Sequence, residues 1–405
     1  MKNFNIKIER KNGVVIFVLE GRMDSNNSID FSNILMSNIQ RDKDKSVTFD
    51  CKKLDYISSA GLRVLLSLRK KEKLNVKLIN VSDEVNNILD TTGFSQIFEV
   101  SKAIEDISGT LVKLMGETSD LAMYKMPDDT ILKLYPAGTQ LEDVEKELRY
   151  TKATLVSGVP TLISYYIVIY NGRYGIIYEM PNVKTVSAMI DFQKWKLGHY
   201  SEEMGKTLRL IHECEPDTTI LPQTSKIFLK YALKMQNYFN DEEAEKLLEL
   251  VKAIPEKSAT IYGNYHSGNV FVQNDELILI NMAGVSYGNP IFDLGRTYMT
   301  YVLEAEWLSK RLTGLEANLA KKFWDIMIRS YLDTNDEEIV KEHEEVIKSA
   351  ALLCSALFPA MGNLSESDTE KLIAKTRRNV FPMFDKMKDL LSKRFIEQGI
   401  ENLPF

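Results

Sequence analysis

The spacing of apolar residues changes along the 405-residue chain, and this change restricts the folds that the chain can adopt. In the first hundred residues, short β-branched runs alternate with stretches whose apolar residues recur at helical spacing. Strands are predicted at 4–8, 14–19, 47–51 and 76–81, a hairpin turn at Asn12-Gly13, and helices at 25–40, 62–68 and 85–89. Alternating strands and helices predict an α/β domain in which helices pack on a sheet.

A different pattern begins near Leu111. Strands are predicted at 111–115, 121–125, 130–135, 162–170 and 174–179, with a helix at 141–156 between the third and the fourth. From Val183 onward helical spacing dominates, apart from a strand pair at 270–273 and 277–280 that turns at Asn274-Asp275. This order predicts a small β-rich lobe followed by a large helical lobe, and residues 101–108 mark the boundary with the first domain.

Charge, cysteine spacing and hydropathy argue against several functional classes. The chain has 51 Lys+Arg and 57 Asp+Glu, a net charge of −6, which does not suit a protein whose main activity is to bind nucleic acid phosphates. Cys51, Cys214 and Cys354 are too widely spaced for a disulfide framework or a zinc ribbon, which favours a reducing cytoplasm. The N-terminus lacks an apolar run, and the longest apolar stretch, 350–361, is shorter than the roughly 20 residues of a membrane helix. We therefore expect a cytoplasmic protein whose partners include neither nucleic acid nor a membrane.

Two adjacent serines lie where a predicted strand is followed by a helix, in residues 54–62 (LDYISSAGL). A hydroxyl at a helix start caps the helix. The free N–H groups and the positive end of the helix dipole also stabilise a phosphate there. Ser58 and Ser59 are therefore either plain helix caps or candidates for phosphorylation.

Together with residues 21–24 (GRMD), this segment resembles the STAS domain family of anti-sigma factor antagonists over about residues 4–104. The resemblance implies a small sheet backed by helices, without an active site, and assigns residues 1–104 to this domain. In that family the serine two positions before the motif glycine is reversibly phosphorylated, and alignment on Gly61 gives this role to Ser59. The family often has Asp at the position of Ser58. A phosphate would add roughly −2 charge and change how an anti-sigma-type protein partner docks.

The second domain contains candidates for a phosphoryl-transfer site. Such a site needs a lysine on the phosphates, an acid that orients it, metal ligands, and a carboxylate near the acceptor hydroxyl. Lys133 lies in an apolar predicted strand, and Glu147 on the following helix could pair with it. Each residue by itself also suits an ordinary role, as a sheet-edge lysine that reaches water or as a solvated helix residue.

Three later segments, 262–270 (YGNYHSGNV), 278–281 (ILIN) and 288–294 (GNPIFDL), resemble the aminoglycoside phosphotransferase and choline kinase group of the protein-kinase-like fold. The family pattern is HGDxHxxN, then an Asp that ends a strand, then a Gly and an Asp further on. The resemblance covers about residues 108–405. It implies a bilobal α+β domain with an N-lobe to about residue 180 and a C-lobe from about residue 183.

The resemblance implies ATP and Mg²⁺ as cofactors. Lys133 would hold the phosphates, Glu147 would orient Lys133, and Glu179 and Met180 would form the hinge beside the nucleotide. The expected nucleotide loop, residues 116–120, has one glycine where the family has a glycine-rich loop.

The remaining matches lie on the loop and metal positions. His266 would brace the loop, Asp293 would hold the backbone beneath it, and Asn269 would be a magnesium ligand. Asn264 occupies the position of the acceptor-activating Asp, and Asn281 the position of the second metal-ligating Asp. An amide cannot take a proton at neutral pH and brings no charge to Mg²⁺. The sequence therefore predicts weakened Mg²⁺ binding and severely impaired transfer.

The favoured hypothesis is a signalling protein with a phosphoserine-switch STAS domain and a nucleotide-binding, catalytically impaired phosphotransferase-like domain. One alternative is an ATP-dependent small-molecule kinase of aminoglycoside phosphotransferase type, inactivated by natural or engineered Asp-to-Asn changes. Another is a docking scaffold without enzymatic activity. The C-terminal helices that would form the acceptor pocket carry no motif, so they name no substrate, and Ser59 of the same chain is one candidate acceptor.

Overall fold

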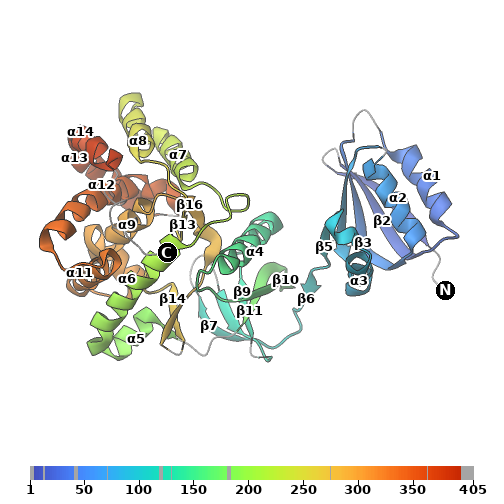
Figure 1. The fold of residues 1–405 in the computed structure, drawn as a ribbon, viewed down its shortest axis with the longest axis horizontal. Helices are drawn as coiled ribbons and strands as arrows, with labels where there is room; N and C mark the ends of the chain where they lie inside the picture. Colours follow the sequence, from blue (N-terminus) through green and yellow to red (C-terminus); the bar gives the residue numbers. More distant parts are fainter. Residues whose placement is uncertain are drawn as a thin grey trace. The chain divides into compact units, whose positions relative to one another are not determined.

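The computed structural model divides the chain into two compact units, Met1–Ser108 and Gly109–Phe405. Figure 1 shows both units. The structure describes residues 4–11, 14–40, 44–70, 72–117, 122–128, 130–179, 184–273, 275–362 and 364–393. The predicted turn at Asn12-Gly13 and the turn residue Asn274 lie outside these ranges. Within the described ranges, no helix is both long enough and apolar enough to span a membrane.

The first unit is built on a five-stranded sheet in the order β1-β2-β3-β4-β5. The strands are β1 (Asn5–Lys11), β2 (Val14–Met23), β3 (Ser46–Ile57), β4 (Asn75–Val81) and β5 (Glu99–Lys102), and a two-residue strand, β6 (Glu105–Asp106), follows. β1 pairs with β2 in antiparallel fashion, and the other neighbours are parallel. The sequence did not predict β5, which is short and has no fully buried residue to set an alternation.

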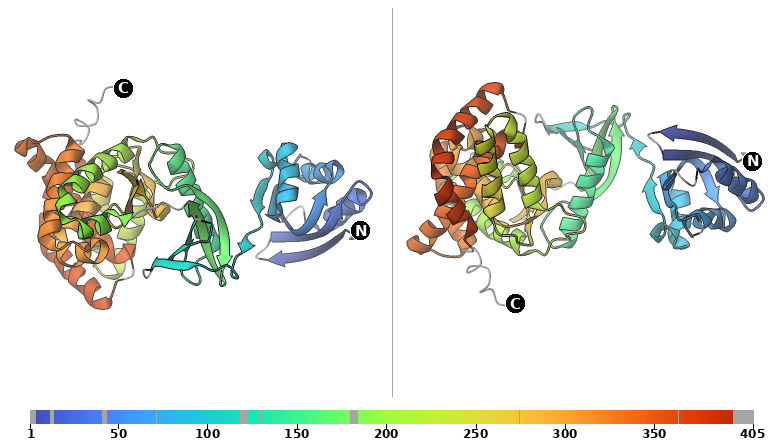
Figure 2. Two further views of the ribbon diagram at one scale, coloured as in Figure 1. Left: turned by 90° about the horizontal axis from the view of Figure 1, so that it is seen from below. Right: turned by 90° about the horizontal axis from the view of Figure 1, so that it is seen from above.

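Helices cover one face of this sheet, as the two views of Figure 2 show. They are α1 (Ser28–Asn38), α2 (Ser59–Lys70), α3 (Asp83–Thr91) and the 3₁₀ turn Phe94–Gln96. Alternate residues of β2, including Phe17 and Leu19, are fully buried and pack with Phe31 of α1 and Leu65 of α2. Because one set of alternating side chains faces the helices, this sheet has a single buried face.

The second unit begins with a lobe of antiparallel strands, in which five strands run in the order β10-β11-β9-β8-β7. They are β7 (Lys113–Glu117), β8 (Ala122–Lys125), β9 (Thr130–Leu134), β10 (Ser164–Tyr170) and β11 (Arg173–Glu179). Helix α4 (Leu141–Val156) packs on β10 and β11. The predicted helix has the same bounds as α4, because its apolar residues keep helical spacing throughout.

A helical lobe follows. Its helices are α5 (Val186–Phe192), α6 (Leu197–Glu213), α7 (Thr224–Lys234), α8 (Asp241–Ala253), α9 (Ile291–Tyr298), α10 (Lys310–Thr313), α11 (Ala317–Leu332), α12 (Glu337–Met361), α13 (Glu366–Asn379) and α14 (Phe384–Ser392). Two π-helical turns, Met299–Leu303 and Ala305–Ser309, lie between α9 and α10. The predicted architecture, an α/β domain followed by a bilobal domain with a β-rich lobe and a helical lobe, is confirmed.

The helical lobe contains more strands than the predicted pair. β14 (Val270–Gln273) and β15 (Glu276–Leu279) form that pair, and β12 (Lys184–Thr185) joins β14. β13 (Ala259–Ile261) pairs with β16 (Ser286–Gly288). The prediction of a single strand pair was therefore incomplete, because strands of two or three residues are too short to show a period in the sequence.

Close packing of α6 against α11 positions one support of the site. A Cβ added at Gly205 would lie 2.4 Å from the backbone oxygen of Met327, so the glycine lets the two helices approach closely. Tyr265, on the loop after β13, donates its hydroxyl to the backbone oxygen of Met204 on α6 at 2.8 Å. Helix α6 therefore lies directly behind the loop that carries most of the predicted site residues.

Candidate functional site

Lys133 on β9 and Glu147 on α4 form a buried ion pair, with side chains 5% and 2% exposed. The Tyr135 hydroxyl donates to the second oxygen of Glu147. Burial and the Glu147 carboxylate raise the pKa of Tyr135 above its usual range, so the hydroxyl stays protonated and keeps donating. Because Lys133 and Glu147 are both desolvated, each charge depends on the other, and the ammonium is held at a defined position.

The loop between β13 and β14 is held from below by Asp293, near the start of α9. Its two carboxylate oxygens accept the backbone N–H groups of Tyr262 and Gly263, each at 2.7 Å. His212 of α6 contacts the same carboxylate at 3.2 Å through Nε2, and its Nδ1 lies 2.8 Å from the Tyr331 hydroxyl. This network fixes the backbone on which Asn264 lies.

The loop itself is stabilised by local hydrogen bonds. Asn269 donates its side-chain amide to the backbone oxygen of Asn264 at 3.2 Å, and Gly268 donates its N–H to His266 Nδ1 at 3.2 Å. Burial, and secondly the charge of Arg296, lower the pKa of His266 to about 3. His266 is therefore neutral at physiological pH and supports the loop as a hydrogen-bond acceptor.

Asn281 follows β15 and faces Lys133 across the site. Its backbone is left-handed, with φ 66° and ψ 66°, a conformation that Asn and Asp adopt more readily than most residues. Lys133 Nζ donates to Asn281 Oδ1 at 3.0 Å. The lysine therefore bridges a carboxylate on one side and an amide on the other.

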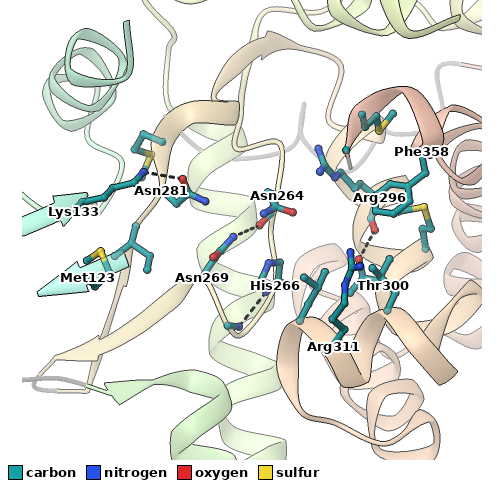
Figure 3. A pocket seen from close by; sticks show the side chains of 18 of the residues that line it. Met123, Lys133, Asn264, His266, Asn269, Asn281, Arg296, Thr300, Arg311 and Phe358 are labelled. Atoms are coloured by element: carbon teal, nitrogen blue, oxygen red, sulfur yellow. Dashed lines mark hydrogen bonds between the residues drawn. The ribbon is translucent and has the colours of Figure 1, made fainter. Parts of the chain in front are cut away.

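These side chains line a cavity of about 560 Å³ between the two lobes of the second unit, shown in Figure 3. In this view Lys133 and Met123 lie on one side of the loop, and Arg296, Thr300 and Phe358 lie on the other. We call the first side, with Leu162 and Ile280, the strand half, and the second side the helical half. Among the described residues that line the cavity, Lys133, Arg296 and Arg311 carry charge and none is an aspartate or glutamate.

The serine pair of the first unit has a simpler geometry. Ser58 accepts the backbone N–H of Gly61 through its hydroxyl at 3.3 Å and that of Leu62 through its backbone oxygen at 3.0 Å, so it caps α2. Ser59 is the first residue of α2 and is exposed. A Cβ added at Gly61 would lie 2.3 Å from the sulfur of Met23, which explains the glycine of this motif.

Comparison with known families identifies both units. The model of the phosphotransferase enzyme family matches residues 117–322, just over half of the chain. The chain belongs to the phosphotransferase enzyme family. The STAS domain model matches residues 5–107, so this phosphotransferase domain is fused to a STAS domain.

Individual proteins are similar to one unit or to the other. BtrV of Bordetella bronchiseptica, a candidate anti-sigma factor antagonist, is 29% identical over 103 residues, which are 25% of this chain and 88% of BtrV. A choline/ethanolamine kinase family protein from Mesorhizobium loti has a TM-score of 0.48 at 10% identity and covers 71% of this chain and 94% of its own. An ADP-bound aminoglycoside phosphotransferase has a TM-score of 0.44 at 10% identity and covers 69% of this chain and 94% of its own.

The phosphotransferase domain brings together most of the site residues that the sequence indicated. Lys133, Asn264, His266, Asn269 and Asn281 line one cavity, and the remaining ones support it from outside: Glu147 behind Lys133 and Asp293 beneath the loop. Glu179 is not among the described lining residues, and its carboxylate accepts the backbone N–H of Ile163 at 2.8 Å. Met180 and residues 118–120 of the predicted nucleotide loop, 116–120, lie outside the described residues.

The cavity suits a nucleotide better than a magnesium ion. A fixed ammonium at the edge of an apolar wall, formed by Met123, Leu162 and Ile280, matches a phosphate chain joined to a flat base. No group of three or more His, Cys, Asp or Glu side chains that could hold a metal occurs in the described part of the chain. The oxygen of Asn281 already accepts a hydrogen bond from Lys133. Since Mg²⁺ prefers carboxylates and phosphates, these residues do not fit a kinase-type metal site.

Sequence reasoning missed several contributors to the site. The sequence indicates Tyr135 only as part of a predicted strand, because its contact with Glu147 depends on how α4 packs. Arg296 lies three residues after Asp293, one helical turn along α9, so the helical repeat could have placed it near the loop. Arg311 on α10 has no such signal, because its position depends on the two π-helical turns.

Proposed function

We propose that this chain is a signalling protein in which the STAS domain is a phosphoserine switch and the phosphotransferase domain binds a nucleotide but transfers phosphate poorly. The observation that carries the proposal is a buried Lys133–Glu147 pair beside a cavity whose described lining includes no carboxylate. The pair supplies the cation that a nucleotide phosphate needs. The two amides, Asn264 and Asn281, lack the charge that proton removal and metal binding need.

Nucleotide binding is tested by calorimetry of the full chain with ATP, with and without Mg²⁺. We expect binding that Mg²⁺ strengthens only slightly, and its loss in Lys133→Ala. Lys113→Ala, an exposed lysine on β7 of the same lobe, is the matched control and should bind as the original chain does. Absence of binding at millimolar ATP, in the chain and both variants alike, would favour the docking scaffold instead.

Transfer is tested by restoring both carboxylates. Asn264→Asp with Asn281→Asp should produce phosphoryl transfer from labelled ATP, whereas neither single change should suffice, because residues that act as a unit give non-additive effects. Label that moves to a small molecule would favour the small-molecule kinase. Label on the chain that disappears with Ser59→Ala would make Ser59 an acceptor. A double variant that binds ATP but transfers nothing would contradict the impaired-kinase part of the proposal.

The switch is supported by the contrast between the two serines. The Ser58 hydroxyl caps α2, whereas Ser59 is exposed at the start of that helix, where the positive end of the helix dipole would stabilise a phosphate. Its negative charge would alter the surface that an anti-sigma-type partner contacts. Phosphopeptide mapping of the protein from its native host should find phosphate on Ser59. Phosphate found on Ser58 alone would refute the assignment.

A further inference from the structure

The helical half of the cavity has a chemistry that the proposed function leaves unused. Arg296 of α9 is half-buried, and its guanidinium makes no hydrogen bond or ion pair with any described residue. Its charge acts on the loop between β13 and β14, where it contributes to lowering the pKa of His266. A partly desolvated guanidinium without a partner loses hydration that an anion could replace.

A second arginine lies at the same half. Arg311 of α10 lines the cavity and is exposed, with its guanidinium carbon 5.4 Å from the centre of the Trp307 ring. Trp307 is thus in contact with the cation without neutralising it. Two guanidinium groups on one cavity wall repel each other unless an anion lies between them.

The buried carboxylate on the same stretch of chain does not fill this role. Glu304 accepts hydrogen bonds from Lys375 Nζ at 2.6 Å, the Ser355 hydroxyl at 2.9 Å and the Trp307 indole at 3.1 Å. These three donors satisfy both of its oxygens. Hydrogen bonds, and to a smaller extent the charge of Arg311, lower the pKa of Asp368. Neither Arg296 nor Arg311 forms an ion pair with a described carboxylate, so both guanidinium groups can still contact an anionic ligand.

Apolar side chains form the rest of this half. Met299 and Leu308 come from the two π-helical turns, Leu312 from α10, and Phe358 from α12. π-Helical turns are rare and occur often at functional sites, because the extra residue redirects side chains. A wall that is apolar apart from two arginines matches a ligand with an apolar body and one anionic end.

We propose that the helical half binds a small amphiphile whose oxyanion, a carboxylate or a phosphate, contacts Arg296 and Arg311 and whose apolar part lies against Met299, Leu308 and Phe358. The planar guanidinium suits either oxyanion, because both accept two parallel N–H bonds. Polycations such as aminoglycosides are excluded by like charge. This inference deepens the proposed function, since it names the ligand class for the second half of the same cavity.

Three probes of equal chain length test the inference on the full chain: octanoate, octyl phosphate and octylamine, titrated by calorimetry without nucleotide. At least one oxyanion should bind and octylamine should not, and the better oxyanion identifies the headgroup. Arg296→Gln should weaken oxyanion binding about tenfold or more, the effect of losing a charged hydrogen bond. Arg311→Gln, at an exposed position that should not disturb folding, should weaken it as well, whereas Arg378→Gln on α13 is the control and should not.

Three results would overturn the inference: octylamine binding as tightly as the oxyanions, oxyanion binding that neither Arg296→Gln nor Arg311→Gln weakens, or no oxyanion binding at millimolar concentration. An ATP titration of the same samples separates this inference from the proposed function. Oxyanion binding without ATP binding refutes the nucleotide role alone, and ATP binding without oxyanion binding refutes the amphiphile site alone.

Discussion

Ser59 is exposed at a single strand-to-helix turn of the STAS domain, whereas the cavity of the phosphotransferase domain is lined from β8, β9, the loop after β13, α9, α10 and α12. The first site needs one local turn and a free hydroxyl. The second needs elements from Met123 to Leu364 packed correctly around buried charge. A modifying enzyme can therefore reach the first site without disturbing the core, while small changes to the second affect stability and binding together.

The largest contrast is expected from removal of a paired lysine in each domain. Lys133→Met leaves Glu147 buried with Tyr135 as the one donor to its carboxylate among the described residues, and should cost about 3–5 kcal/mol. All three tryptophans lie in the phosphotransferase domain, so urea unfolding followed by tryptophan fluorescence reports its stability alone. Lys102→Met removes the exposed partner of Asp83 in the STAS domain and should change hydrogen exchange there very little. A similar loss of stability in Lys133→Met and Lys102→Met would contradict the expected difference between the buried and the exposed ion pair.

The second largest difference is expected between the two motif glycines, Gly263 and Gly61, in the stability that is lost when each is replaced by alanine. Gly263 has φ 84°, and an added Cβ would lie 2.4 Å from the backbone oxygen of Gly284, so Gly263→Ala should cost about 3 kcal/mol through strain and overlap. Gly61→Ala meets the sulfur of Met23, which can move aside, and should cost about 1 kcal/mol. Urea unfolding measures the first loss and hydrogen exchange the second. Gly198→Ala on α6, with no atom within 4 Å, is the control, and a loss at Gly198 equal to that at Gly263 would argue against this explanation.

Low pH should destabilise the phosphotransferase domain more than the STAS domain, because all four histidines lie in the phosphotransferase domain. His266 has a pKa of about 3 when folded against an ordinary value of 6.5, so between these values the unfolded state binds more protons. Stability is therefore lost as pH falls from about 6.5 toward 3, and His266→Gln should remove up to about 1.4 kcal/mol per pH unit from that slope. Urea unfolding at a series of pH values measures it. An unchanged slope in His266→Gln would show that other groups cause the acid sensitivity.

The smallest expected difference is between the stability costs of replacing the two serines of the STAS domain. Ser58→Ala removes the α2 cap and should cost about 1 kcal/mol, whereas Ser59→Ala should stay within about 0.5 kcal/mol. Hydrogen exchange of the α2 amides in the full chain measures both. If Ser59→Ala lowered the stability of α2 more than Ser58→Ala does, Ser59 and not Ser58 would be the residue that caps the helix.

The fold was predictable where elements are long and periodic. The predicted helix at 141–156 has the bounds of α4, and the predicted hairpin at 4–8 and 14–19 corresponds to β1 and β2. β13 and β16 were missed because three residues carry no measurable period. The predicted helix at 25–40 is longer than α1, Ser28–Asn38, because residues 25–27 form a turn and the backbone of Ile39 is extended. The motif residues of the candidate site were recognisable because each is tied to its neighbours in sequence.

By itself the sequence determined the two-domain order, the serine pair of the STAS domain, and the motif segments whose resemblance assigns Asn264 and Asn281 to positions where the family pattern has Asp. These follow from side-chain type and short-range spacing, which packing cannot change. Only the tertiary structure placed Lys133 against Asn281, 148 residues away, and turned Arg296 and Arg311 toward the cavity that Lys133 also lines. Those contacts depend on how helices and strands pack around a shared core. The spacing of residues along the chain does not directly show which distant residues come into contact.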